Sequence, residues 1–424
     1  MRQLSCSICF VLLWASNLGA QSKELHFVTW KSEAPAVWQQ AIADFERDNP
    51  GVRVIQEIGP QSSTQLHDLL AQKLKNRDPG LDVFMMDVVW PAEFASASWA
   101  LPLDRYFTSA ARKEFIEAPI LAGQYEQQIY AVPLFIDAGL LYFRKDLLQK
   151  YSLPAPRTWP ELVESAKTII AGEKESGLTG YSGQFKQYEG LICNLMELVL
   201  SNRGAFWDER RQVSLVDQPA AVSAVQFVRD HVIGAIANRA VLAYEEPESL
   251  ALFTQGRAIF HRNWPYAWTV AEDAKSSRVA GKVGVSELPS FPGGNSVATL
   301  GGWQLAISRF SRQPDLAWRF VNFMTGEQIQ KRIARATGRA PTRRALYDDA
   351  QLTAAMPQLK FLLTIFKHAV PRPRTPVYLP LSNVMQRYFS SVLALPDTDI
   401  KGRSSLAARD MNRLLELARE KPTR

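Results

Sequence analysis

The sequence has little cysteine and, beyond its first residues, no long hydrophobic run. Its 424 residues include three cysteines, at Cys6, Cys9 and Cys193. If the N-terminal segment is removed only Cys193 stays, and a lone cysteine forms no internal disulfide. No later segment has the ~20 consecutive apolar residues that a membrane-spanning helix needs. The chain therefore depends on a buried core, which its 46% hydrophobic content permits.

The sequence also lacks the common enzyme signatures. It has no phosphate-binding loop, no dinucleotide fingerprint, no paired-histidine metal helix and no Gly-x-Ser-x-Gly elbow. Its five histidines show no ligand spacing, so we expect no metal site and no cofactor. The net charge of +7 is a small excess of 49 basic over 42 acidic residues and gives no support to nucleic-acid binding.

One basic stretch stands out between Lys331 and Arg344. It contains six basic residues: Lys331, Arg332, Arg335, Arg339, Arg343 and Arg344. A nucleic-acid patch would need interleaved aromatic residues or an element that enters a groove. We interpret the stretch as a solvated basic helix face and loop, with a docking surface for a membrane partner as the alternative.

The first twenty residues have the pattern of a secretory signal. Arg2 precedes an apolar run over residues 4–14, and the small residue Ala20 stands before a polar Gln21. The alternative, a membrane anchor, needs a longer apolar run. We therefore expect a signal peptide at 1–20, cleavage near Ala20 and a soluble protein in the periplasm.

The chain that follows alternates strand and helix patterns. Strands are predicted at 25–30, 52–55 and 81–86, and amphipathic helices at 37–45 and 66–74. This alternation predicts an α/β fold with a parallel sheet. Ligands of such sheets bind at the carboxyl ends of the strands, where Glu33, Asp87 and Trp90 lie.

A second unit begins near residue 130. An extended run is predicted at 139–143, helices at 187–201 and 219–233, and a short strand at 257–260. A stretch rich in proline and glycine at 287–294 breaks the pattern. Another strand is predicted at 300–307, and the chain is mostly helical from Pro314 onward.

Tryptophan is abundant, with eleven residues. Trp90, Trp264, Trp268 and Trp303 lie at loops or strand ends, although core packing is the default for any one of them. Trp303 differs because the preceding glycines leave a backbone that another molecule can approach closely. Indole rings beside carboxylates suit sugars, whose C–H faces stack and whose hydroxyls need buried hydrogen-bond partners.

Four stretches make the chain resemble a known family. They are DVFMMDVVWP at residues 82–91, DAGLLYFRKDLL at 137–148, GGWQLAIS at 301–308 and RPRTP at 372–376. The sequence resembles the extracellular solute-binding proteins of ABC sugar importers (family 1), particularly the trehalose/maltose-type binding proteins. The resemblance implies sugar contacts at these positions: Glu33, Asp87, Asp137, Trp264, Gly302, Trp303 and Arg372. Phe135 replaces a tyrosine that is frequent in the family.

The resemblance further implies a two-lobed periplasmic-binding-protein fold of type II, which is maltose-binding-protein-like, with a hinge and an interlobe cleft. The N-terminal lobe is expected over 21–132 plus 288–328, and the C-terminal lobe over 133–287 plus 329–424. The implied protein is a monomer without catalysis. It captures a disaccharide or small oligosaccharide and delivers it to the membrane subunits of an ABC importer.

Two other functions remain open from the sequence. A secreted glycoside hydrolase could use Asp87 and Asp137 as acid and nucleophile. The chain lacks the regular strand–helix repeat of the eight-fold barrel that many hydrolases use. An importer component for a cationic or metal ligand is a third possibility, which the abundant tryptophan disfavours.

Overall fold

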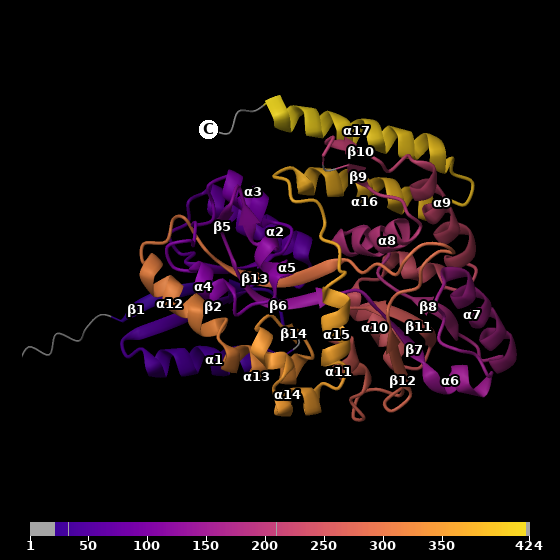
Figure 1. Ribbon diagram of the computed structural model, residues 1–424, viewed down its shortest axis with the longest axis horizontal. Coiled ribbons are helices and arrows are strands. Elements are labelled where there is room, and N and C mark those ends of the chain that lie inside the picture. Colours follow the sequence, from indigo (N-terminus) through magenta and orange to yellow (C-terminus); the bar gives the residue numbers. More distant parts are fainter. Residues whose placement is uncertain (1–21, 33, 209, 421–424) are drawn as a thin grey trace, which may run out of the picture.

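The computed structural model describes residues 22–32, 34–208 and 210–420, so the predicted signal peptide lies outside the described residues. The chain folds into two α/β lobes that lie side by side in Figure 1, each built on its own sheet. The larger sheet has six strands, in the order β14 (Ala340–Pro341), β6 (Val132–Ala138), β13 (Leu300–Ile307), β3 (Val83–Asp87), β1 (Lys23–Thr29) and β2 (Val52–Ile58).

The six-stranded sheet is mixed rather than wholly parallel. β1 pairs in parallel with β2 and with β3, which confirms the predicted parallel arrangement for the first three strands. β13 runs antiparallel to both β3 and β6, and β14 is antiparallel to β6. The prediction was incomplete because these later strands return to the sheet from distant parts of the chain.

The second lobe contains a four-stranded sheet. Its order is β12 (Val283–Ser286), β7 (Leu140–Arg144), β11 (Ala258–Asn263) and β8 (Thr179–Ser182). Two short hairpins stand apart from these sheets. One pairs β4 (Gln124–Tyr125) with β5 (Gln128–Ile129), before the first crossing, and the other pairs β9 (Trp207–Asp208) with β10 (Val213–Ser214) in the second lobe.

Helices cover both sheets. The first half of the chain contains α1 (Pro35–Asp48), α2 (Ser63–Lys75), α3 (Pro91–Ser96), α4 (Ser109–Arg112), α5 (Glu117–Ala122), α6 (Lys145–Lys150), α7 (Trp159–Glu173) and α8 (Glu189–Ser201). The second half contains α9 (Pro219–Phe227), α10 (Glu246–Thr254), α11 (Ala267–Ala271), α12 (Pro314–Met324), α13 (Glu327–Thr337), α14 (Ala350–Ala355), α15 (Leu359–Phe366), α16 (Tyr378–Ala394) and α17 (Ile400–Glu420). Short turns of other helix types are η1 (Val228–Val232), η2 (Arg239–Ala243) and η3 (Arg344–Tyr347).

The core of the lobe with the six-stranded sheet follows the predicted periodicities. The apolar stripe of α1 buries Trp38, Ala41 and Phe45, and the Phe45 ring lies 5.0 Å from the ring of Phe320 on α12. Every residue of β3 is buried, as expected for a strand covered on both faces. This rigid core holds the carboxyl end of β3 in place.

The chain crosses between the lobes at short segments. Gly139 alone separates β6 of the larger sheet from β7 of the smaller one. The return runs through residues 287–299, between β12 and β13, and contains the predicted proline- and glycine-rich break. β14 and all of β6 except Val132 fall in the predicted C-terminal range, although both strands belong to the six-stranded sheet. The lobe boundaries stay a prediction.

Two surface properties follow from the described part of the chain. None of its helices is both long and apolar enough to cross a membrane.

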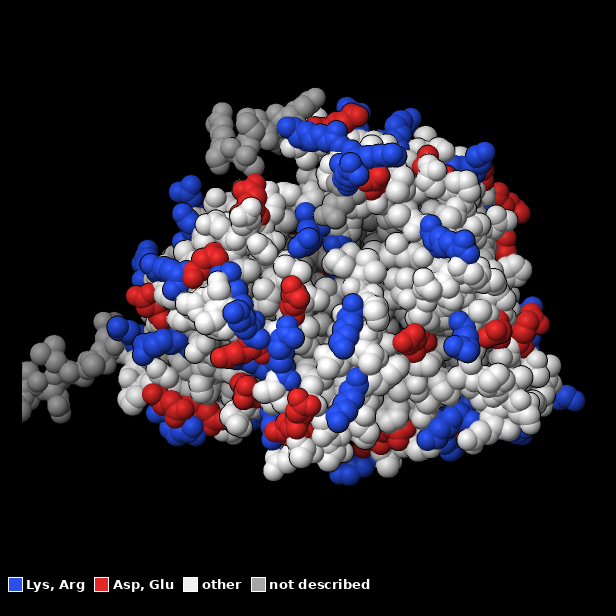
Figure 2. Space-filling model, viewed as in Figure 1, with Lys and Arg blue, Asp and Glu red and all other residues white. Residues whose placement is uncertain are grey.

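Figure 2 shows Lys and Arg side chains interspersed with Asp and Glu over the viewed face, so the basic excess does not gather into one patch there. The yellow α17 lies along the top of the molecule in Figure 1, packed on α16 and α9.

Candidate functional site

A cavity of about 110 Å³ lies between the two sheets. Its wall includes six of the seven predicted site residues, namely Asp87, Asp137, Trp264, Gly302, Trp303 and Arg372. Glu33, the seventh, lies outside the described residues. Other lining residues are Trp30, Gln61, Ser62, Ser63, Tyr188, Glu189, Gly190, Cys193, Glu245, Glu246, Pro247, Tyr266, Gly301 and Arg339. The cavity thus combines aromatic rings with paired acidic and basic groups.

The pairing of three neighbouring strands brings the predicted residues together. Asp87 is the last residue of β3, and its partner in β13 is Trp303. Gly301 of β13 is paired with Asp137 of β6 on the other side. Because β13 lies between β3 and β6, it places an indole ring and two carboxylates at one end of the sheet.

Gly302 has a backbone conformation and a packing environment that favour glycine. Its φ is +134°, and a Cβ atom there would lie 2.6 Å from the carbonyl oxygen of Phe135. The register of β13 against β6 shifts directly afterwards, between Trp303 and Gln304. The glycine therefore allows β13 to approach β6 closely just before the Trp303 side chain enters the cavity wall.

A chain of buried charges links the two lobes. Arg372 Nη2 lies 3.3 Å from Asp87 Oδ1, and Arg372 Nη1 lies 2.8 Å from Glu189 Oε1. Ser382 also donates to Glu189, at 2.6 Å, as does the Tyr378 hydroxyl. Burial raises the pKa of Asp87 to about 6, against the opposing effect of the Arg372 charge. Arg372 therefore stabilises two carboxylates from different lobes.

Arg339 is a second buried arginine in the cavity wall, contrary to the predicted solvated face. It is 8% exposed, and its Nη1 lies 3.4 Å from Asp137 Oδ2. Its guanidinium lies within 5.2 Å of the ring centroids of Trp30, Phe135 and Tyr266. The interpretation of this basic stretch as a solvated face is wrong here, because the β14–β6 pairing carries Arg339 inward.

Arg343 departs from the same prediction. It is 9% exposed, donates to the carbonyl oxygen of Thr325 at 3.0 Å and pairs with Glu114. Lys331 and Arg332 are partly exposed and engaged in ion pairs with Asp349 and Asp44. The predicted solvated face is therefore wrong for Arg339 and Arg343, which are buried, whereas Lys331 and Arg332 are partly exposed and Arg335 and Arg344 are exposed.

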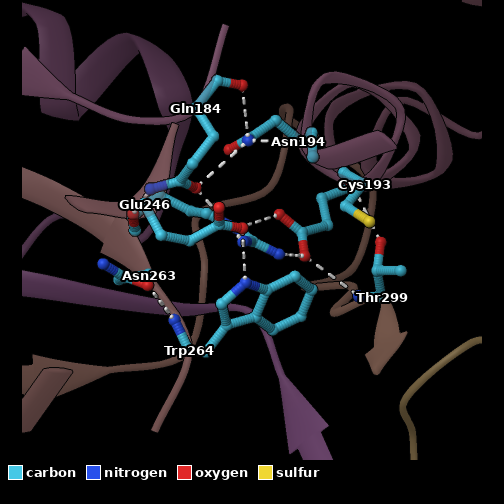
Figure 3. A network of polar contacts seen from close by, with 10 residues as sticks. Gln184, Cys193, Asn194, Glu246, Asn263, Trp264 and Thr299 are labelled. Atoms are coloured by element: carbon cyan, nitrogen blue, oxygen red, sulfur yellow. Dashed lines mark hydrogen bonds and ion pairs between the residues drawn. The ribbon is translucent and has the colours of Figure 1, made fainter. Parts of the chain in front are cut away.

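Trp264 precedes α11 and is held at the cavity by polar contacts (Figure 3). Its indole Nε1 donates to Glu246 Oε1 at 3.1 Å, and the Tyr188 hydroxyl donates to Glu246 Oε2 at 2.8 Å. Arg262 lies over the indole, with its Cζ 3.9 Å from the ring centroid. The ring is thus partly buried and fixed, as a stacking surface requires.

The other tryptophans fall into two groups. Trp303 is partly buried and packs on Trp30, with ring centroids 4.8 Å apart, and on Trp90 at 5.5 Å. Trp90 is 2% exposed and belongs to the core of the lobe with the six-stranded sheet. Trp268 packs against a separate core cluster and does not line the cavity. Core packing is therefore the role of Trp90 and Trp268.

Phe135 lies behind the cavity wall instead of in it. Its side chain is 1% exposed, 5.5 Å from the Trp30 ring and 4.7 Å from the Arg339 guanidinium. A tyrosine hydroxyl at this position would need a hydrogen-bond partner in a tightly packed aromatic cluster. The phenylalanine leaves the cation–π contact with Arg339 as the main interaction of this ring with a charged group.

Sequence reasoning missed Glu189 and Glu246. Glu189 is the first residue of α8 and Glu246 is the first residue of α10, so both helices begin at the cavity. The helix dipole favours acidic residues in the first turn of a helix, and this preference is the sequence pattern that could have drawn attention to Glu189 and Glu246. That signal alone does not tell which helix begins at a ligand site.

The described residues contain no group of three or more His, Cys, Asp or Glu that could hold a metal ion. Cys193 lines the cavity, and burial raises the pKa of its thiol to about 12, so it stays protonated at neutral pH. The chemistry available at the cavity is hydrogen bonding by carboxylates and arginines together with stacking on indole rings.

Comparisons with known proteins agree with this architecture. A probable ABC transporter-binding protein of Deinococcus radiodurans is 37% identical over 340 residues, which cover 79% of this chain and 80% of the relative. The mannitol-binding protein of Pseudomonas aeruginosa is 25% identical over 73% of this chain and 72% of its own length.

Solved structures are similar over nearly the whole chain. Maltose-bound MalE3 of T. maritima matches with a TM-score of 0.86 and 36% identity, covering 93% of this chain and 99% of that one. A solute-binding protein of Agrobacterium vitis S4 with bound D-mannitol matches in fold, with a TM-score of 0.82, 22% identity and coverage of 93% and 99%.

The family model agrees with these matches. The model of the bacterial extracellular solute-binding proteins matches residues 29–331, which contain most of both sheets and much of the cavity wall. The match also spans the first crossing at Gly139 and the return between β12 and β13. The chain belongs to the family of bacterial extracellular solute-binding proteins.

Proposed function

We propose that this protein binds a disaccharide or small oligosaccharide of the trehalose/maltose type between its two lobes. It delivers the sugar to the membrane subunits of an ABC importer and works as a monomer. The observation that carries the proposal is the cavity, where Trp264 and Trp303 lie beside two buried carboxylate–arginine pairs. The similarity to maltose-bound MalE3 supports the choice of sugar.

Each proposed contact has a physical role. Trp264 and Trp303 offer indole faces to pyranose C–H surfaces, while Asp87 and Asp137 accept hydrogen bonds from hydroxyls. Arg372 donates to hydroxyl oxygens, and the Gly302 backbone lets the sugar approach closely. Glu33 stays a proposed contact from the sequence resemblance. We add Glu246 and Arg339, which line the same cavity.

The test is calorimetric titration of the purified protein with maltose and with trehalose. We expect one site per chain for at least one of them. Recovery of the sugar unchanged by chromatography would support binding without catalysis. The pKa of Asp87 is about 6, so a fraction of this carboxyl carries the proton that the general acid of a glycoside hydrolase donates. Release of glucose from either sugar would therefore support the alternative, a glycoside hydrolase that uses Asp87 and Asp137.

Export to the periplasm is part of the proposal. The segment 1–20 has the signal pattern described above, and the family is extracellular. We expect the mature chain to begin at or near Gln21 and to be released by osmotic shock. Recovery from the cytoplasm with Met1 retained would contradict export.

A further inference from the structure

The orientation of Trp264 is set by groups behind its ring. One face lies against Arg262, whose Cζ is 3.9 Å from the ring centroid, well within the ~6 Å reach of a cation–π contact. The backbone N–H of Trp264 donates to Asn263 Oδ1 at 2.8 Å, and the indole N–H donates to Glu246 (Figure 3). A Cβ at Gly301 would lie 3.1 Å from the ring edge. The ring is thus held at one face, at its edge and at its nitrogen.

Arg262 is in turn held by a buried bidentate ion pair. Its Nη2 lies 2.5 Å from Glu197 Oε1 and its Nε lies 2.8 Å from Glu197 Oε2, and both residues are at most 2% exposed. Gln184 Oε1 accepts from Arg262 Nη1 at 3.3 Å. Because a bidentate pair fixes the guanidinium plane, Arg262 presents a defined surface to the indole.

The same ion pair touches two of the segments that pass between the lobes. A Cβ at Gly139 would lie 2.0 Å from Glu197 Oε1 and 2.7 Å from Arg262 Nη2, so the first crossing packs directly on the pair. The backbone N–H of Thr299, just before β13, donates to Glu197 Oε1 at 3.0 Å. The ion pair therefore connects the two crossings with the wall of the cavity.

We infer that Glu197 and Arg262 are positioning residues for Trp264. They fix the ring as a stacking surface and tie its orientation to the two crossings, so that ligand contact at Trp264 and the relative position of the lobes are coupled. The inference rests on the proposed function, in which a saccharide stacks on Trp264. Neither residue lines the cavity, so both act through the indole.

A purely structural ion pair would behave differently. Replacing both partners of a buried pair with apolar residues is often neutral for stability, whereas removing one partner leaves an uncompensated charge. The informative variant is therefore Glu197→Met with Arg262→Met, which removes both charges and keeps similar volumes. A structural pair replaced in this way leaves sugar affinity unchanged once the protein is folded.

The first measurement needs no ligand. Protein labelled with 5-fluorotryptophan gives one fluorine signal per tryptophan, and Trp264→Phe identifies the signal of Trp264. We expect this signal to shift or broaden in the paired methionine variant, while the signal of Trp90 stays in place. An unchanged Trp264 signal in folded variant protein would overturn the inference, whether or not a sugar binds.

The second measurement is a double-mutant cycle on the maltose or trehalose Kd. We expect the paired methionine variant to weaken binding by roughly tenfold in the natural background, and by less than about twofold when Trp264→Ala is already present. An equal loss of sugar affinity in both backgrounds would show that the Glu197–Arg262 pair affects binding independently of the Trp264 ring, and would contradict the inference. If the unaltered protein binds neither sugar, the proposed function fails while the fluorine measurement still decides the inference.

Two further variants complete the test. Arg144→Met with Asp146→Asn removes an ion pair in which Arg144 Nη2 lies 2.6 Å from Asp146 Oδ2, at the end of β7 away from Gly139. This double variant is expected to leave both the Trp264 signal and the Kd unchanged. Arg262→Lys keeps the charge and loses the bidentate geometry, so it should displace the Trp264 signal with less risk to folding. Melting temperatures of all variants establish that each is folded.

Discussion

Two buried carboxylates in the cavity wall each lie against an arginine that is distant in the sequence. Asp87 is paired with Arg372, and Asp137 with Arg339. Burying a carboxylate is costly unless it is paired, and the arginines offset that cost. For Asp87 the Arg372 and Val89 contacts both reach Oδ1, which leaves Oδ2 as the oxygen we expect a sugar hydroxyl to reach.

The pH dependence of stability follows from Asp87. Burial raises its pKa to about 6, above the unfolded value of about 3.9, so the folded state binds the proton more tightly. Its contribution to stability is largest below pH 4 and is lost as the pH rises to 6. We therefore expect the unfolding free energy of Asp87→Asn, minus that of the natural protein, to increase by roughly 2 kcal/mol between pH 4 and pH 7.

Denaturant unfolding at several pH values from 4 to 7 measures this difference. Asp82→Asn is a matched control, because this carboxylate is also buried but lies at the opposite end of β3, away from the cavity. A difference for Asp87→Asn that decreases as the pH rises would mean that the Arg372 charge outweighs burial, and the assigned pKa direction would be wrong.

Trp303 is expected to contribute to both binding and packing. It lines the cavity and also packs on Trp30 and Trp90. Trp303→Ala should weaken sugar binding by about 2 kcal/mol or more, because a large rigid stacking surface is lost. The melting temperature should also decrease, but by less than for a wholly buried tryptophan.

Calorimetric titration and thermal melting of the Trp303 variant provide the measurement. Trp268→Ala is the control, since Trp268 is also partly buried but packs away from the cavity. It should lower the melting temperature without changing the Kd. Unchanged affinity in Trp303→Ala would contradict the stacking role.

At the scale of elements, the sequence predicted β3 and β13 and a candidate site residue on each. Asp87 was predicted because the carboxyl end of a short apolar strand such as β3 is a favoured ligand position. Trp303 lies within β13 and was predicted from the two glycines before it. Both residues line the cavity, and their contact with a sugar stays a prediction. Arg339 was missed because its direction depends on the pairing of β14 with β6, about two hundred residues away in sequence. Local periodicity carries no information about such pairings.

The close pairing of β13 with β6 predicts a strong effect at Gly302. Gly302→Ala adds a methyl group 2.6 Å from a backbone oxygen in a conformation with φ of +134°. Overpacking of this kind costs about 1–3 kcal/mol beyond the backbone strain. Because the shift in register follows Gly302, the Trp303 ring should also move, and sugar affinity should decrease.

The matched control for this prediction is Gly51→Ala. Gly51 also has a positive φ, at +82°, but a Cβ there would meet nothing within 4 Å. It should cost only the strain of the backbone conformation, roughly 1 kcal/mol. Equal losses of unfolding free energy in the two variants would show that the contact with β6 is not the cause.

At the scale of the whole molecule, the cavity walls come from both sheets. Asp87, Gly302 and Trp303 are carried by the six-stranded sheet, whereas Trp264 follows directly after β11 of the four-stranded sheet. Few segments connect the sheets, and Gly139 alone joins β6 to β7. Short connections of this kind permit the lobes to rotate as rigid bodies about the crossings.

A ligand that contacts both walls binds the closed arrangement better than the open one and shifts the population toward it. We therefore expect a saturating concentration of maltose or trehalose to decrease the radius of gyration measured by X-ray scattering. Arg372 joins Asp87 and Glu189 across the cavity. Trp303→Ala at the same sugar concentration is the control and should show little change. A radius that stays constant while calorimetry shows full saturation would mean that the sugar binds without movement of the lobes.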